Sequence, residues 1–269
     1  MFSRAILIGA ALIAILTTKV FAEDFLFSDT QADCVAQIIF LNECSGKEKN
    51  LLFWSPQEAF PSVGIGHFIW YPEGETGPYQ ESFPGYLDFA QEIGLKLPDW
   101  IIERNTRQAP WRNRQEFISD QDSDRVRELF IFLRDTKREQ AHYILRRFCR
   151  VFPTLLDSLD DNERDTVQAR YDLLIQSLRG AFAMIDYVNF KGEGFNSDAR
   201  YNGQGWGLAH VLLEMKMPDD PKKALDEFVD AAERVLERRV AHAPRPDVES
   251  RWLAGWKNRL RQYRHITCG

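Results

Sequence analysis

Two carboxylates and a hydroxyl group lie close together in the N-terminal part of the chain. Glu43 ends a segment with helical periodicity, and Glu58 and Ser62 follow in a segment rich in aromatic and β-branched residues. The C-terminal end of a helix carries negative partial charge, which favours the protonated carboxyl that a general acid needs. A second carboxylate can activate water or stabilise a cationic sugar. These residues therefore indicate acid-catalysed cleavage of a glycosidic bond, with Glu43 as the acid and Glu58 as the second carboxylate.

The elements that position these groups can be predicted from periodicity and turn residues. Ser28 is expected to cap a first helix that ends near Gly46. Residues 51–54 and 60–71 are broken by proline and glycine, and they predict a small β-hairpin or meander. Helical spacing dominates the rest of the chain. We expect helices over residues 82–94, 122–134, 136–149, 162–185, 206–216, 221–241 and 247–264.

One helix, a small sheet and then many helices are typical of an α+β domain that is mainly α. No internal repeat or obvious linker divides the sequence. Residues 23–269 are therefore predicted to form a single domain whose hairpin region lies at about 50–72.

The hairpin segment contains the tetrapeptide Gly-Ile-Gly-His at residues 64–67. With Glu43 at the end of the preceding helix, this order of elements resembles phage-type lysozymes. The resemblance implies a lysozyme-like fold enlarged by C-terminal helices, with Glu43 as catalytic acid, Glu58 as second acid and Ser62 as the hydroxyl residue that positions water. The chain departs from that family at Cys44, where the family has glycine, and at Glu58, where it has aspartate.

Three longer strings, at residues 64–72, 186–194 and 203–208, resemble signature blocks of an uncharacterised family of exported bacterial proteins. That resemblance spans nearly the whole mature chain and implies no activity. The third string is also similar to a stretch of goose-type lysozymes and lytic transglycosylases. The residues shared with that stretch are Gly207 and Leu208.

Candidate substrate-binding residues occur in the hairpin and in two glycine-rich segments, 191–194 and 202–207. His67 is expected to hold the hairpin by a hydrogen bond or ion pair. Trp70 and Tyr71 either offer flat rings to sugar faces or belong to the hairpin core. Loops with polar side chains often carry function, and the glycines there either admit a ligand or shape a turn. The predicted set is His67, Trp70, Tyr71, Asn189, Lys191, Glu193, Gln204 and Trp206, with Glu193 as an alternative acid.

The first 22 residues have the form of an export signal. Arg4 precedes an apolar run over residues 5–15, and Ala22 offers a small residue at a cleavage site. No later stretch has the roughly 20 apolar residues of a membrane-spanning helix. The mature chain is therefore expected in the periplasm or outside the cell, with no transmembrane segment. An uncleaved N-terminal anchor is the alternative.

Composition excludes several classes of function. A net charge of -6 argues against general nucleic-acid binding, and the arginine-rich stretch 234–264 also contains acidic residues, as a solvated helix face does. No glycine-rich segment follows a strand in a nucleotide-binding pattern, and no cysteine or histidine spacing fits a metal site. No cofactor is implied.

The chain has four cysteines, which permits disulfides in an exported protein. Cys34 and Cys44 lie too far apart on one helix to bridge each other. Any bridge is expected to join one of them to Cys149 or Cys268, and free buried thiols are the alternative. Cys44 could also act as a nucleophile with a distant histidine, but no family signature surrounds it.

The sequence thus predicts an exported glycoside hydrolase that cleaves the glycan strands of peptidoglycan. Two alternatives stay open. One is a non-catalytic module that binds glycan or an envelope protein through the same groove. The other is a lytic transglycosylase, which needs only one acid.

Overall fold

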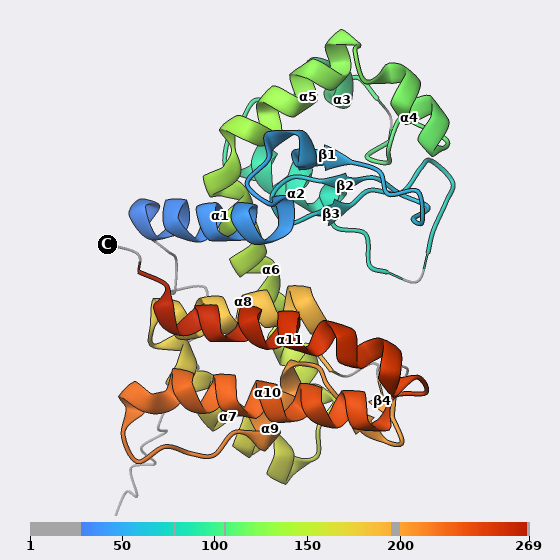
Figure 1. Ribbon diagram of the computed structural model, residues 1–269. Helices are drawn as coiled ribbons and strands as arrows, with labels where there is room; N and C mark the ends of the chain where they lie inside the picture. Colours follow the sequence, from blue (N-terminus) through green and yellow to red (C-terminus); the bar gives the residue numbers. More distant parts are fainter. Residues whose placement is uncertain (1–27, 78, 105, 195–199, 268–269) are drawn as a thin grey trace, which may run out of the picture.

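A computed structural model of the protein describes residues 28–77, 79–104, 106–194 and 200–267 (Figure 1). This part of the chain is mainly helical, with a small antiparallel sheet. The predicted class, α+β and mainly α, is therefore confirmed. The predicted signal peptide lies outside the described residues.

The first helix, α1 (Asp29–Cys44), begins and ends as its sequence predicts. Ser28 and Gln31 form a capping box, in which each side chain accepts a hydrogen bond from the other residue's backbone N–H. At the other end Ser45 adopts a left-handed conformation with φ 53°, and Gly46 follows with φ 64°. This turn stops the helix directly after Glu43 and Cys44, so the carboxylate lies on its last turn.

A short 3-10 helix, η2 (Glu48–Leu51), leads into three strands of two residues each, β1 (Leu52–Phe53), β2 (Ser62–Val63) and β3 (Phe68–Ile69). They pair antiparallel in the order β1-β2-β3, with Val63 opposite Leu52 on one side and Phe68 on the other. The predicted meander is confirmed, although much of residues 51–71 is turn rather than strand.

The Gly-Ile-Gly-His turn is fixed against the long helix α6 (Lys137–Asp157). The buried side chain of Gln140 accepts a hydrogen bond from the Ile65 N–H at 2.8 Å and donates one to the Leu133 carbonyl at 2.7 Å. Gly64 has φ 74°, and a Cβ there would lie 2.3 Å from the Gln140 amide oxygen. Only glycine fits this approach, so the tetrapeptide holds the hairpin on α6.

Four further helices pack around the sheet, and α6 leaves this half of the molecule for the other (Figure 1). α6 contacts α1, α2, α7 and α8, so it connects the two halves. The helices of the sheet half are α2 (Phe83–Glu92), α3 (Asp99–Ile102), α4 (Arg114–Asp120) and α5 (Asp124–Asp135).

The second half is a helical bundle with one small hairpin (Figure 1). The stretch 162–185, predicted as one helix, contains two, because Ser177 caps a new helix start by accepting from the Gly180 N–H. The elements here are α7 (Asp161–Ile175), α8 (Leu178–Lys191), β4 (Arg200–Tyr201), β5 (Gln204–Gly205), α9 (Leu208–Glu214), η3 (Pro221–Lys223), α10 (Ala224–His242), α11 (Pro246–Gln262) and η4 (Tyr263–His265).

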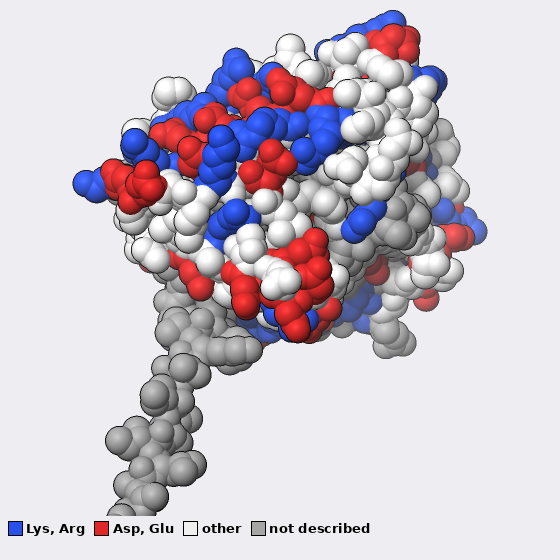
Figure 2. All heavy atoms as spheres, turned by 90° about the horizontal axis from the view of Figure 1, so that it is seen from below, with Lys and Arg blue, Asp and Glu red and all other residues white. Residues whose placement is uncertain are grey.

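Most arginines of α10 and α11 are paired with acidic side chains, so the stretch forms no basic patch. Arg261 pairs with Glu233, and Arg264 pairs with Asp226 and Asp230. Figure 2 shows basic and acidic side chains mixed across one face of the molecule. Among the described residues no helix is long and apolar enough to cross a membrane.

Candidate functional site

A cleft of about 650 Å³ lies where the two halves of the molecule meet. Its wall comes from the end of α1, the turn and strand at residues 66–69, the segment before α2, the middle of α6 and the end of α8. Five of the predicted site residues line it together: Glu43, His67, Asn189, Lys191 and Glu193. Residues from distant parts of the sequence are thus brought to one concave surface, as in most ligand sites.

Glu43 is held in this cleft by an arginine from the far end of the chain. The Arg259 guanidinium donates a hydrogen bond of 2.6 Å to Oε1 of Glu43. The same guanidinium binds both carboxylate oxygens of Asp186 at 2.8 Å, and the Tyr263 hydroxyl donates to Asp186 at 2.5 Å. Among the described residues, only Arg259 hydrogen-bonds the Glu43 carboxylate, so α1, α8 and α11 are joined at one point.

Burial and charge set the protonation of the groups around Glu43. Burial alone would lower the pKa of Arg259, but its hydrogen bonds to Asp186 and the charges of Asp186 and Glu43 hold it above its ordinary value. Burial, followed by the charge of Asp186, raises the pKa of Tyr263 far above its ordinary value. Arg259 thus places a permanent positive charge beside Glu43.

Lys191 is the most strongly perturbed cation of the cleft. Its ammonium lies 3.4 Å from the ring centre of Trp256 and 4.1 Å from that of Phe190. Burial, with a smaller contribution from the charge of Arg239, lowers its pKa to about 7. Asn189 and Lys191 lie on the last turn of α8, not in the loop that the sequence predicts.

Glu58 and Ser62 do not join Glu43 at the cleft. Glu58 is exposed in a turn where its N–H donates to Ser55 and its carbonyl accepts from the Trp54 indole. Ser62 is buried in β2. Neither lines the cleft, so the predicted pairing of Glu43 with Glu58 is wrong in this structure, because the segment between β1 and β2 leaves Glu58 exposed to solvent. The acidic residues that line the cleft among those described are Glu43 and Glu193.

Trp70 and Tyr71 belong to the hairpin core, the second of the two interpretations that the sequence leaves open. Trp70 is 1% exposed, donates to the Arg107 carbonyl and packs on Phe83. Tyr71 is 3% exposed and packs on the Phe60 ring. Neither ring has a free face for a sugar, so the sugar-stacking role predicted for them is wrong.

The second glycine-rich segment forms a separate cavity of about 350 Å³. Gln204, Arg200 and Arg238 line it, together with His210. A Cβ on Gly205 would lie 2.1 Å from the His210 ring, so the glycine there lets the β4–β5 hairpin pack on this histidine. Trp206 is buried beneath Arg239, whose guanidinium lies 4.1 Å from its ring centre. Gln204 and Trp206 are therefore not part of the cleft.

His210 makes the stability of the protein depend on pH. Burial, and then the charges of Arg200 and Arg238, lower its pKa to about 4 from an ordinary 6.5. Its Nδ1 is buried without a hydrogen-bond partner in the described chain, and Glu163 and Glu214 also face the cavity. Between pH 6.5 and 4 the unfolded chain binds a proton at this position and the folded protein does not, so stability falls as pH falls through this window.

We expect His210→Gln to remove this contribution. The free energy of unfolding of the parent, measured by urea denaturation, should fall more steeply than that of the variant from pH 6.5 to 4, by at most about 1.4 kcal/mol per pH unit. Carboxylates titrate in both proteins, so the difference between the two slopes of unfolding free energy against pH reports the contribution of His210. Equal slopes would contradict a neutral His210.

The cysteines settle two alternatives. Cys34 is disulfide-bonded, while Cys44 and Cys149 are free thiols and Cys268 lies outside the described residues. A bridge from Cys44, or one to Cys149, is therefore excluded. The Cys44 sulfur lies 3.7 Å from Nε2 of His67, which joins the hairpin turn to the end of α1 as predicted for this histidine.

Cys44 is expected to be inert in the folded protein. It is fully buried, and burial followed by the charge of Glu43 raises its pKa to about 12, so little thiolate forms at neutral pH. In a Cys149→Ser background, a disulfide-exchanging thiol reagent at pH 8 should react with Cys44 only after unfolding. If Cys44 of the folded protein reacted within seconds, its thiol would be accessible and reactive, which would support the interpretation of Cys44 as a nucleophile.

The sequence contained a signal for the missed partners of Glu43. Asp186 lies in a helix of apolar residues, and a buried carboxylate needs a charged or hydrogen-bonding partner. Arg259 lies in the arginine-rich stretch that the sequence predicts to be a solvated helix face, and Tyr263 follows it four residues later. Nothing local joins these positions to Asp186 or to Glu43.

Comparisons of the chain with protein-family models, with curated proteins and with solved structures found no match. The resemblance to phage-type lysozymes therefore depends on the helix-end Glu43, the hairpin and residues 64–67 alone. Within the described ranges, no three His, Cys, Asp or Glu side chains lie close enough to hold a metal ion.

Proposed function

We propose that the protein cleaves the glycan strands of peptidoglycan, with Glu43 as general acid and a lysozyme-like arrangement of the cleft. The observation that carries this proposal is the position of Glu43, on the last turn of α1 in the wall of the cleft. A fixed carboxyl group that faces a concave surface is what proton transfer to a bound glycosidic oxygen requires.

In this mechanism Glu43 gives its proton to the leaving glycosidic oxygen as the bond to the anomeric carbon breaks. A water molecule then adds to that carbon, and a carboxylate takes its proton. Glu193 lines the same cleft and is the second carboxylate available for that step. Asn189 and Lys191 lie beside it and provide an amide and an ammonium to bind substituents of the sugars.

A lytic transglycosylase is the second candidate, and one observation favours it. Glu58 lies away from the cleft, which leaves Glu43 without the second acid that the sequence predicts. A transglycosylase uses one acid and closes the sugar on its own hydroxyl, which leaves an anhydro end instead of a reducing end.

Export of the protein is part of the proposal. The segment 1–22 has the composition of a signal peptide, and Cys34 is disulfide-bonded, a state that persists in the periplasm and outside the cell.

The direct test is digestion of purified peptidoglycan by the mature chain, with the soluble products analysed by mass. Release of muropeptides with reducing ends supports the hydrolase, and anhydro ends support the transglycosylase. If peptidoglycans of several chemistries release nothing while the folded protein still sediments with them, the protein is a binding module and the catalytic proposal is wrong.

A further inference from the structure

We propose that Trp252 on α11 is a sugar-stacking residue that extends the cleft into a longer glycan-binding track. This inference rests on the proposed function and adds the substrate class of the site, a polymer several sugars long. Trp252 is 52% exposed, whereas the other tryptophans of the protein are buried or half-buried.

The position of Trp252 on its helix connects it to the acid. Trp252, Trp256 and Arg259 follow one another at spacings of four and three residues, so they lie on one face of α11. Arg259 on this face holds Glu43. At about 1.5 Å per residue, Trp252 lies roughly 10 Å along the helix from Arg259, toward its exposed end.

Direct contacts lead from the cleft to this tryptophan. Lys191 lines the cleft and rests on the Trp256 ring, and Trp256 lies 6.2 Å from Trp252 between ring centres. Trp256 is half-buried, with Lys191 over its ring and Arg239 5.1 Å from its centre. It therefore supports its neighbour, and Trp252 has the accessible ring.

A second exposed ring borders the cleft from the opposite half of the molecule. Tyr79 is 61% exposed, lines the cleft and has the Phe60 ring 6.1 Å away at a steep angle. The segment that joins β3 to α2 and carries Tyr79 runs toward the α11 side of the molecule (Figure 1). In place of the buried Trp70 and Tyr71, the exposed rings available for sugar stacking are Tyr79 in the cleft wall and Trp252 on α11.

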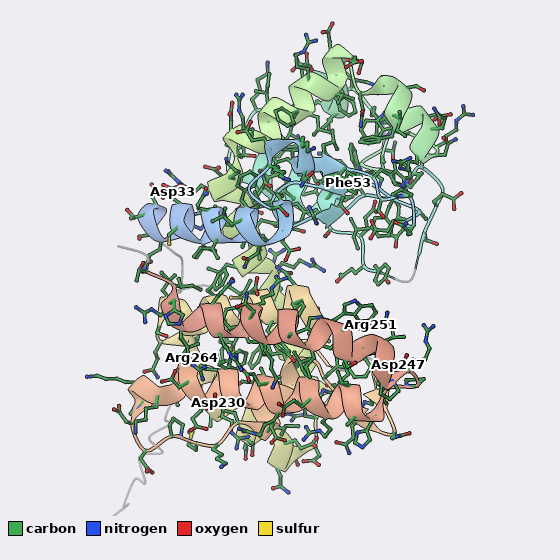
Figure 3. All side chains as sticks on the ribbon, in the orientation of Figure 1. Asp33, Phe53, Asp230, Asp247, Arg251 and Arg264 are labelled. Atoms are coloured by element: carbon green, nitrogen blue, oxygen red, sulfur yellow. The ribbon has the colours of Figure 1, made fainter. Side chains whose placement is uncertain are left out.

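The chemistry of this surface fits a glycan. Flat apolar rings cover the apolar face of a pyranose, while hydroxyl, amide and carboxylate substituents need polar partners at the edge. Lys191 and Asn189 supply such partners where the track enters the cleft. Arg251, beside Trp252 on α11, is exposed and adds a cation at the outer end (Figure 3).

The test measures binding separately from cleavage. Peptide-free glycan strands released from peptidoglycan are titrated into the Glu43→Gln protein and into the same protein with Trp252→Ala. We expect the Kd to rise on the order of 10-fold on loss of the ring. In the otherwise unchanged enzyme, Trp252→Ala should raise KM more for long strands than for disaccharide fragments.

Phe53→Ala is the matched control, because Phe53 is an exposed aromatic residue, 44% accessible, on the sheet half away from α11 (Figure 3). Its Kd should stay at the parent value. Equal Kd values with and without Trp252, or no binding by the Glu43→Gln protein, would overturn the inference. Binding that depends on Trp252 without any cleavage by the parent would support the inference and refute the proposed activity.

Discussion

Replacement of Glu43 by glutamine is expected to lower the rate of glycan cleavage by about 10²- to 10⁴-fold, the usual contribution of a general acid. Glutamine keeps the size of the side chain and an oxygen that can accept the Arg259 hydrogen bond. It removes the only proton that this residue can deliver. The measurement is the initial rate of muropeptide release at saturating peptidoglycan, so that kcat is compared rather than binding.

Variants of two other carboxylates show whether the loss of rate comes from the missing acid or from the missing negative charge. Glu58→Gln should leave cleavage close to the parent rate, because Glu58 is exposed and does not line the cleft. In a hydrolase, where a second carboxylate takes the proton from water, Glu193→Gln should lower kcat. A transglycosylase does not need that step, so there Glu193→Gln should leave kcat close to the parent value. Cleavage by Glu43→Gln at the parent rate would contradict the assignment of the acid.

The lost charge beside Arg259 is the alternative cause of any defect in the Glu43→Gln protein. Glu43 is about one-quarter exposed, and its arginine partner keeps the bidentate pair with Asp186. The variant is therefore expected to unfold within about 1 kcal/mol of the parent in urea. A large loss of stability with a matching loss of rate would indicate a structural role for Glu43.

The elements around the site could be predicted because their signals are local. The Ser28 cap, the turn at Gly46 and the helical spacing each act within a few residues.

Contacts between distant residues had no such signal. Arg259 and Glu43 are 216 residues apart, and nothing near either one selects the other among the many charged residues of the chain. The same applies to Trp70 and Trp252, since a tryptophan next to a hairpin and one on a helix are equally able to face the core or the solvent. Trp70 is buried among the rings of Phe83 and Trp111, whereas Trp252 stays exposed on α11.

Asp186→Ala is expected to be the most destabilising single change at this site, with a loss of roughly 3–5 kcal/mol in the free energy of unfolding. Asp186 is 2% exposed and binds both the Arg259 guanidinium and the Tyr263 hydroxyl. Its removal leaves a largely buried cation and a buried hydroxyl without their partner, and the cost of that desolvation is no longer offset. Urea denaturation at pH 7 measures the effect.

Asp230→Ala provides the comparison for a surface ion pair. Asp230 is 54% exposed and pairs with Arg264 at the outer face of the bundle (Figure 3), where such a pair contributes about 0–1 kcal/mol. Adding Arg259→Met to Asp186→Ala should recover part of the lost stability, because the unpaired charge is then gone. The double variant should nevertheless cleave glycan poorly, since Glu43 has lost the arginine that positions it. If Asp186→Ala were no more destabilising than Asp230→Ala, the buried network would not be what joins α1, α8 and α11.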